Sequence, residues 1–132
     1  GENVATTEVE AAAIKFPQTE DAVVYGIEIP GRDGRCGMLS YTVKPGEELD
    51  LAGLATHLQA TLPKYAVPRF MRVEQVQEVT GTFKHQKAKL KKQGYDLEQI
   101  DEPLYYLAPG AAAFVPLTAE IVAEIEAGTA KL

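Results

Sequence analysis

Two apolar runs joined by a short glycine-containing turn constrain the fold of this chain most strongly. Residues 23–29 are rich in branched and aromatic side chains, and residues 37–43 repeat that character. Both runs are typical of β-strands. The segment between them, residues 30–34, reads Pro-Gly-Arg-Asp-Gly. Because so short a link brings two strands together, we expect an antiparallel hairpin here.

Helical patterns flank this hairpin. Hydroxyl residues followed by acids begin the first of them, and Pro17 ends it. Four leucines at helical spacing form one apolar stripe of a second helix. Gly94 is expected to end a third helix, and Thr118 is expected to cap a fourth. We expect helices over 6–16, 51–61, 84–93 and 118–126, and further strands over 69–76, 104–107 and 114–117.

The order of these elements predicts the fold class. A helix, a hairpin, a helix, a strand and a helix follow one another along 132 residues, a length that suits one domain. We therefore expect an α+β domain with a small, mostly antiparallel sheet flanked by helices.

Composition excludes several classes of function. The net charge of −6 and a pI near 4.9 argue against a nucleic-acid binder, which needs a basic surface. A single cysteine, Cys36, cannot form an intrachain disulfide, so the cytoplasm is the expected compartment. The apolar runs are shorter than the ~18 residues of a membrane span. Any membrane contact is therefore expected to be peripheral, at the inner face.

The sequence offers few candidates for autonomous catalysis. His57 and His85 are the only histidines, and neither has a serine or cysteine motif as a partner. The pattern of its helix places His57 on the polar side. Cys36 lies in the hairpin, where a small half-buried residue is expected. Histidines, cysteines and carboxylates lack the spacing of a metal site, so we predict none.

The remaining candidate is a lysine that follows a turn of small residues. Thr80, Gly81, Thr82 and Phe83 precede Lys84, and further lysines follow in an acidic protein. A mobile ammonium group suits contact with phosphate or carboxylate, although a solvated lysine-rich helix face is the alternative. One lysine on one loop, without a pocket, fits a lid that closes on another domain's active site.

Four segments resemble core motifs of the adenylate-forming superfamily. Residues 1–10, Gly-Glu-Asn-Val-Ala-Thr-Thr-Glu-Val-Glu, resemble its eighth motif, and residues 25–35 resemble its hairpin. Leu-Pro-Lys-Tyr-Ala-Val-Pro at 62–68 resembles its Leu-Pro-x-Tyr-x-x-Pro segment. Thr-Gly-Thr-Phe-Lys at 80–84 resembles its tenth motif.

The details of these motifs resemble one branch of the superfamily. Glu78 and Phe83 stand where proline and glycine are usual, which is typical of fatty acid transport proteins and very-long-chain acyl-CoA synthetases. The tail over 103–118 is also similar to that branch. The resemblance covers nearly the whole chain, and its motifs occur in the family's order.

The resemblance implies a function for a larger protein. Residues 1–132 would form the C-terminal lid of an ATP-dependent fatty acyl-CoA synthetase whose N-terminal domain lies outside this sequence. The enzyme would form an acyl-adenylate from fatty acid and ATP, and then a thioester with CoA. Mg²⁺ is expected with the ATP and would be bound by the other domain. The fragment alone would be inactive.

The resemblance also assigns roles to residues on two faces of the lid. Lys84 would reach the carboxylate and the α-phosphate during adenylation, carried on a lysine loop of Thr80, Gly81, Thr82 and Phe83. In the second half-reaction, the opposite face would line the CoA tunnel through Gly1, Glu2 and Asn3.

Three alternatives remain open from the sequence. A bile-acid, carnitine or other carboxylate–CoA ligase would share the same lid, because acyl specificity lies in the other domain. A non-catalytic docking module of a fatty-acid uptake protein would need no lysine at this place. A basic helix that touches anionic membrane would need a larger apolar face than residues 84–93 offer.

Overall fold

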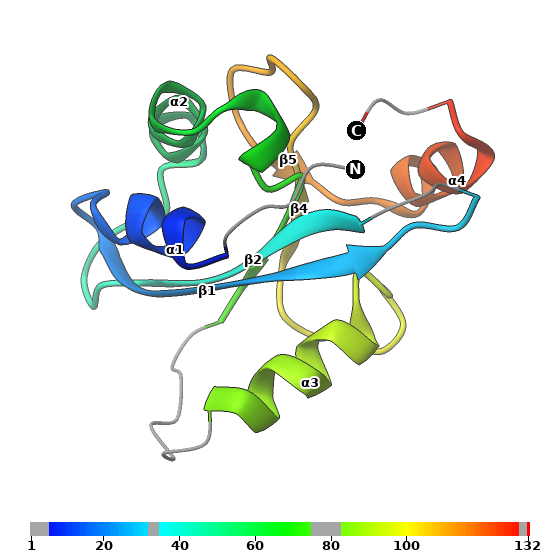
Figure 1. Ribbon diagram of the computed structural model, residues 1–132, viewed down its shortest axis with the longest axis horizontal. Helices are drawn as coiled ribbons and strands as arrows, with labels where there is room; N and C mark the ends of the chain where they lie inside the picture. Colours follow the sequence, from blue (N-terminus) through cyan, green and yellow to red (C-terminus); the bar gives the residue numbers. More distant parts are fainter. Residues whose placement is uncertain (1–5, 32–34, 75–82, 130–131) are drawn as a thin grey trace.

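One five-stranded sheet organises the part of the chain that the structure describes (Figure 1). The structure is a computed structural model that describes residues 6–31, 35–74, 83–129 and 132, with only the backbone for residues 83–87. Its elements are, in order, α1 Thr6–Ile14, β1 Thr19–Glu28, β2 Arg35–Val43, α2 Leu51–Thr61, the 3₁₀ helix η1 Lys64–Ala66, β3 Phe70–Val73, α3 Phe83–Gln93, β4 Leu104–Tyr106, β5 Val115–Pro116 and α4 Ala119–Ala127.

The strands lie in sequence order, β1-β2-β3-β4-β5. The expected hairpin is confirmed, with β1 and β2 antiparallel and Val24 opposite Leu39. β2 and β3 are parallel, and α2 forms the crossover that such a pair requires. β3, β4 and β5 then continue antiparallel. The predicted mostly antiparallel sheet is therefore confirmed.

Helices cover both faces of the sheet (Figure 1). On β1, Ala22 and Val24 join a buried cluster with α1 and α2, whereas Val23, Tyr25 and Ile27 join a second cluster with residues of α3 and α4. This alternation follows from the two-residue period of a strand. The sheet thus separates two apolar cores, and each helix buries an apolar stripe against one of them.

Several predicted boundaries are confirmed. Helix α2 has the predicted ends, and the Asp50 side chain accepts a hydrogen bond from the Gly53 amide at its start. Thr118 caps α4 as predicted, because its Oγ1 accepts from the Ile121 amide at 3.2 Å. After α3, Gly94 takes φ 51°, a conformation that favours glycine at a helix end.

Other boundaries were predicted wrongly. Strand β1 begins at Thr19 rather than at residue 23, because Thr19 pairs with Val43 before a register shift. Because the residues directly after Thr19 are polar, the sequence pattern did not indicate that the strand begins there. The helix expected to reach Phe16 ends at Ile14. β3 is Phe70–Val73, shorter than the predicted 69–76, although residues 75 and 76 lie outside the described residues.

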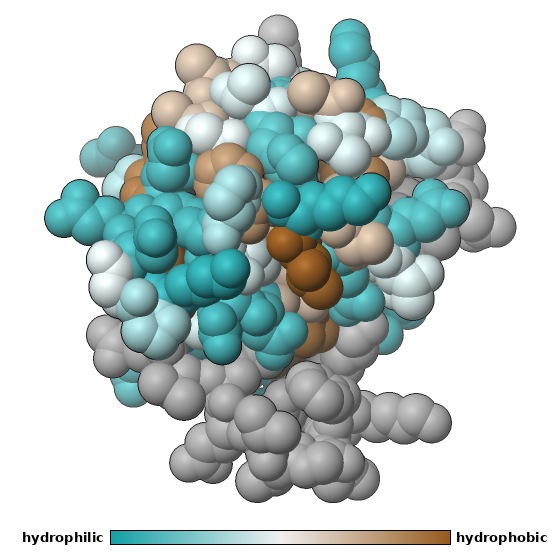
Figure 2. All heavy atoms as spheres, turned by 90° about the vertical axis from the view of Figure 1, so that its left-hand side faces the viewer, coloured by the Kyte–Doolittle hydropathy of each residue, from teal (hydrophilic) through white to brown (hydrophobic). Residues whose placement is uncertain are grey.

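One face of the molecule is mainly polar. Figure 2 views the molecule from the left of Figure 1 and shows a largely hydrophilic face with a small hydrophobic patch near its middle. Apolar patches of this kind are ordinary on folded domains. Among the described residues, no helix is long and apolar enough to cross a bilayer.

Candidate functional site

The candidate lysine lies at the start of helix α3. Phe83 and Lys84 are the first two residues of this helix. The predicted helix over 84–93 is thereby confirmed, and Phe83, which was assigned to the lysine loop, belongs to the helix. Thr80, Gly81 and Thr82 lie outside the described residues, so their loop role stays a prediction.

Gly1, Glu2 and Asn3 also lie outside the described residues. Their predicted part in a CoA tunnel therefore stays a prediction.

Apolar contacts hold the far half of α3 on the sheet. Leu90 is buried in the second core cluster, and Tyr95, just past the helix, stacks on Phe70 of β3 with ring centroids 5.1 Å apart. The Gly94 amide donates to the Leu90 carbonyl at 2.9 Å and closes the last turn. The second half of α3 is therefore fixed against the sheet.

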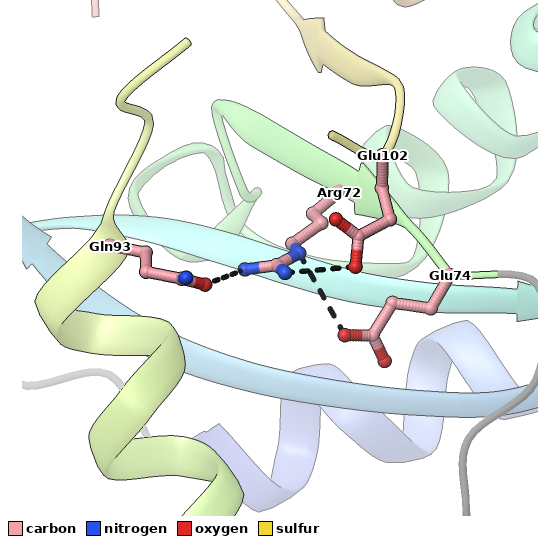
Figure 3. A network of polar contacts seen from close by, with 4 residues as sticks. All are labelled: Arg72, Glu74, Gln93 and Glu102. Atoms are coloured by element: carbon pink, nitrogen blue, oxygen red, sulfur yellow. Dashed lines mark hydrogen bonds and ion pairs between the residues drawn. The ribbon is translucent and has the colours of Figure 1, made fainter. Parts of the chain in front are cut away.

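A buried arginine ties the same end of α3 to the sheet (Figure 3). Arg72, on β3, is only 5% exposed. Its Nη1 donates to Oε1 of Gln93 at 2.6 Å, and its Nη2 donates to Oε1 of Glu102 at 2.9 Å. Its Nε lies 3.7 Å from Oε1 of Glu74. We call Arg72, Glu74, Gln93 and Glu102 the Arg72 cluster.

The electrostatics of this cluster follow from burial and charge. Partial burial is the largest single influence on Glu102 and would raise its pKa, but the hydrogen bond from Arg72, a backbone hydrogen bond and the charges of Arg72 and Lys89 together keep the pKa below its ordinary value. Burial raises the pKa of Tyr25, an effect that Arg72 opposes and Glu74 and Glu102 reinforce. The Tyr25 hydroxyl has no hydrogen-bond partner among the described residues.

Sequence reasoning did not find the Arg72 cluster. The available signal was a charged residue within an apolar strand, because a buried guanidinium requires partners. The identity of those partners was not readable. Glu102 lies 30 positions away and Gln93 lies 21 away.

An open groove of about 750 Å³ is also present and was not predicted. It lies between the hairpin, the end of α3 and α4, and its lining includes Gly26, Arg35, Lys92 and Val122. Acidic side chains, such as Glu126, share that lining with the cations. The groove is therefore mixed in charge.

Among the other candidates, His57 has a structural contact. The prediction that His57 lies on a polar face is wrong, because the ring is half-buried and its Nε2 lies 2.7 Å from the Ala12 carbonyl oxygen. His57 thus links α2 to α1. Cys36 is half-buried, as predicted. Among the described residues, no group of three or more His, Cys, Asp or Glu could hold a metal ion.

Comparison with known families adds an independent finding. The profile of the AMP-binding enzyme C-terminal domain matches residues 8–84, more than half of the chain. This range begins in α1 and ends at Lys84.

Similarity to individual proteins extends over the whole chain. The chain is 41% identical to long-chain fatty acid transport protein 6 of Mus musculus, over all of this chain and 21% of that protein. It is 43% identical to the medium/long-chain-fatty-acid–CoA ligase FadD6 of Mycobacterium tuberculosis, over 97% of this chain and 21% of that protein. The chain therefore spans about a fifth of the length of these relatives.

A solved structure shares the fold. The coronafacic acid ligase of Pectobacterium brasiliense superposes with a TM-score of 0.66 at 19% identity, over 81% of this chain and 20% of that one. The resemblance to the fatty acid transport branch and the α+β fold class are both confirmed. This chain belongs to the AMP-binding enzyme C-terminal domain family.

Proposed function

We propose that this chain is the C-terminal lid of an ATP-dependent long- or very-long-chain fatty acyl-CoA synthetase. One observation carries the proposal: the chain is 43% identical, over 97% of its length, to a protein named as a medium/long-chain-fatty-acid–CoA ligase. Because the chain spans 21% of that relative, the ATP pocket and the acyl site are assigned to a larger N-terminal domain, the partner of this lid.

In the first half-reaction, a carboxylate oxygen of the fatty acid attacks the α-phosphorus of ATP. The bond from this phosphorus to the bridging oxygen breaks, and pyrophosphate leaves. Lys84 supplies a positive charge at the atoms where negative charge accumulates, a contribution to transition-state binding. In the second half-reaction, the CoA thiolate attacks the acyl carbonyl and AMP leaves. The proposal assigns Gly1, Glu2 and Asn3 to the CoA channel.

The sequence of α3 supports a role for its first turn in binding an anion. The amino end of a helix carries partial positive charge and favours acidic side chains. Helix α3 has no acid in its first turn and begins Phe-Lys-His-Gln-Lys. Cations at this end destabilise the helix, because they lie next to its partial positive charge. Residues that destabilise local structure in this way are expected at functional sites. A phosphate or carboxylate near Lys84 would relieve the conflict.

Two further assignments belong to the proposal. Mg²⁺ accompanies the ATP and is held by the large domain. The protein acts in the cytoplasm or at the inner face of a membrane, which the single cysteine supports through its fit to a reducing compartment.

The products of the full-length protein test this function. Purified protein is supplied with oleate, ATP, CoA and Mg²⁺, and thioester and nucleotide products are measured by chromatography. We expect oleoyl-CoA and AMP in equal amounts, and neither when this lid is deleted. ADP as the product, or no thioester from any carboxylate, would contradict the proposal and favour a docking module.

A further inference from the structure

Helix α3 connects the candidate lysine to the Arg72 cluster. The helix is continuous from Phe83 to Gln93, with Lys84 in its first turn and Gln93 in its last. Gln93 follows Lys84 by nine positions, which corresponds to about 13.5 Å along the axis. Since a helix is stiff over this length, its direction at Gln93 sets the position of the backbone at Lys84.

The side chains of α3 are described from residue 88 on, and two of them contact the sheet side of the domain. Leu90 packs in the core, and Gln93 accepts the hydrogen bond from Arg72 at 2.6 Å. A hydrogen bond from a guanidinium is among the stronger kinds and has a defined direction, because the planar fork fixes where the donors point. The Leu90 contact is apolar and without direction, so the Arg72–Gln93 bond adds a directional constraint to the Leu90 packing and the Tyr95–Phe70 stack.

Arg72 also contacts the chain before the lysine segment. Glu74 is the last described residue ahead of residues 75–82, and its carboxylate forms an ion pair with Arg72 Nε at 3.7 Å. The Glu74 amide donates to the Tyr41 carbonyl at 2.9 Å. One guanidinium therefore contacts both Glu74, the last described residue ahead of position 75, and Gln93 in the last turn of α3 (Figure 3).

Glu102 holds that guanidinium in place. It accepts from Arg72 Nη2 at 2.9 Å, and the Arg72 side chain is 6% exposed. A buried guanidinium with a carboxylate on one nitrogen and an amide on another has little freedom to rotate. Rigid support of this kind is what a positioned catalytic group requires.

We infer that Gln93 and Arg72 are positioning residues that aim α3, and through it Lys84, at the reacting atoms during adenylation. This inference rests on the proposed function of Lys84. A tilt of α3 by about 5° around Gln93 would displace the backbone at Lys84 by about 1 Å. Displacements of this size can cost about 100-fold in rate.

The chain offers a matched control in Gln59. Its amide also anchors a helix end, since Nε2 donates to the Ala111 carbonyl at 2.9 Å and Oε1 accepts from the Gly110 amide at 3.2 Å. Gln59 lies on α2, which joins the other core cluster. Gln59→Leu therefore removes a comparable anchor without touching α3.

The experiment compares Gln93→Leu, Gln93→Glu and Gln59→Leu in the full-length protein. Pyrophosphate release from ATP and oleate reports adenylation, and oleoyl-CoA formation from supplied oleoyl-adenylate and CoA reports the second step. Thermal unfolding reports Tm. Should Gln93→Leu not fold, Gln93→Asn, whose shorter amide does not reach Arg72, replaces it.

We expect Gln93→Leu to lower kcat of adenylation by at least about 10-fold, with KM for ATP and the second step unchanged. Gln93→Glu, which keeps an acceptor for Arg72, should restore the rate. Gln59→Leu should lower Tm by about as much as Gln93→Leu does, but it should leave the rate of adenylation unchanged. Loss of a positioning residue lowers the rate of one half-reaction, whereas loss of a merely structural residue lowers the rates of both or of neither.

Two results overturn the inference alone. Either Gln93→Leu and Gln59→Leu have equal effects on adenylation, or Gln93→Leu slows both half-reactions equally, while Lys84→Ala still abolishes adenylation. A wild-type protein that forms no acyl-adenylate overturns the proposed function, and this inference with it.

Discussion

Arg72 and Glu102 form an ion pair at 2.9 Å between β3 and the segment that precedes β4. The arginine side chain is almost fully buried, whereas the carboxylate keeps part of its surface. A buried guanidinium needs a partner of opposite charge, and Glu102 supplies that partner beside the second core cluster.

Replacement of Arg72 by methionine should destabilise the chain. The substitution keeps most of the side-chain volume but leaves Glu102 and Gln93 without their donor. We expect a loss of about 2 kcal/mol in the free energy of unfolding, reduced from fully buried pairs by the exposure of Glu102. Urea unfolding measures it. Arg35→Met, at an exposed pair with Glu28, should change stability by less than about 0.5 kcal/mol. Equal effects of the two substitutions would contradict the burial argument.

The lowered pKa of Glu102 predicts a dependence of stability on pH. In the folded chain, the pKa lies below its ordinary value of 4.5, so the folded state holds the proton less tightly than the unfolded state. The stabilisation is complete above pH 4.5 and is lost as the pH falls through the folded pKa. The stability difference between wild type and Glu102→Gln should therefore shrink between pH 5 and pH 3. A difference that stays constant over this range would rule out the ion pair as its source.

A hydroxyl pair in the other core gives a separate test. Thr19 Oγ1 lies 2.6 Å from the Tyr41 hydroxyl and donates to the Ala13 carbonyl at 2.7 Å, so the tyrosine supplies the remaining hydrogen bond. Tyr41→Phe should cost about 1 kcal/mol in unfolding free energy. Tyr65, which is 57% exposed, provides the control, since Tyr65→Phe should be nearly neutral. If both substitutions were neutral, the Thr19–Tyr41 bond would have no net energetic value.

The cap of α4 predicts a smaller, local effect. Thr118 Oγ1 accepts from the Ile121 amide, one of the free donors at the start of the helix. Thr118→Ala should lower the free energy of unfolding by about 1 kcal/mol, and Thr118→Ser should retain it. Calorimetry of the three proteins distinguishes the cap from simple loss of side-chain volume. Equal losses for Ala and Ser would contradict the capping role.

Local sequence patterns predicted the helices and strands of this fold better than they predicted which of these elements pair or pack together. The leucine stripe and the flanking proline gave α2 its correct bounds, because a local period encodes an amphipathic helix. The parallel pairing of β2 with β3 was not predicted, since it depends on where the α2 crossover returns the chain. Likewise, Thr19 joins β1 by pairing with Val43, 24 positions away.

The candidate site shows the same division. Lys84 stays a prediction from its motif, and the residues that hold its helix were not predicted. Arg72, Gln93 and Glu102 lie far apart in the sequence and meet only after β3, α3 and the segment before β4 have packed. His57 was assigned to a polar face because periodicity does not reveal that α1 lies beside that part of α2.

The most direct test of the account is the effect of Lys84→Ala on each half-reaction of the full-length protein, with Lys92→Ala as the control. Lys92 is an exposed lysine on the same helix, so its loss removes the same charge from α3 at the other end. We expect Lys84→Ala to lower pyrophosphate release by at least about 100-fold while thioester formation from supplied acyl-adenylate remains within a few-fold of wild type. Lys92→Ala should alter neither rate. Adenylation that survives Lys84→Ala, or falls equally in Lys92→Ala, would contradict the assignment of Lys84.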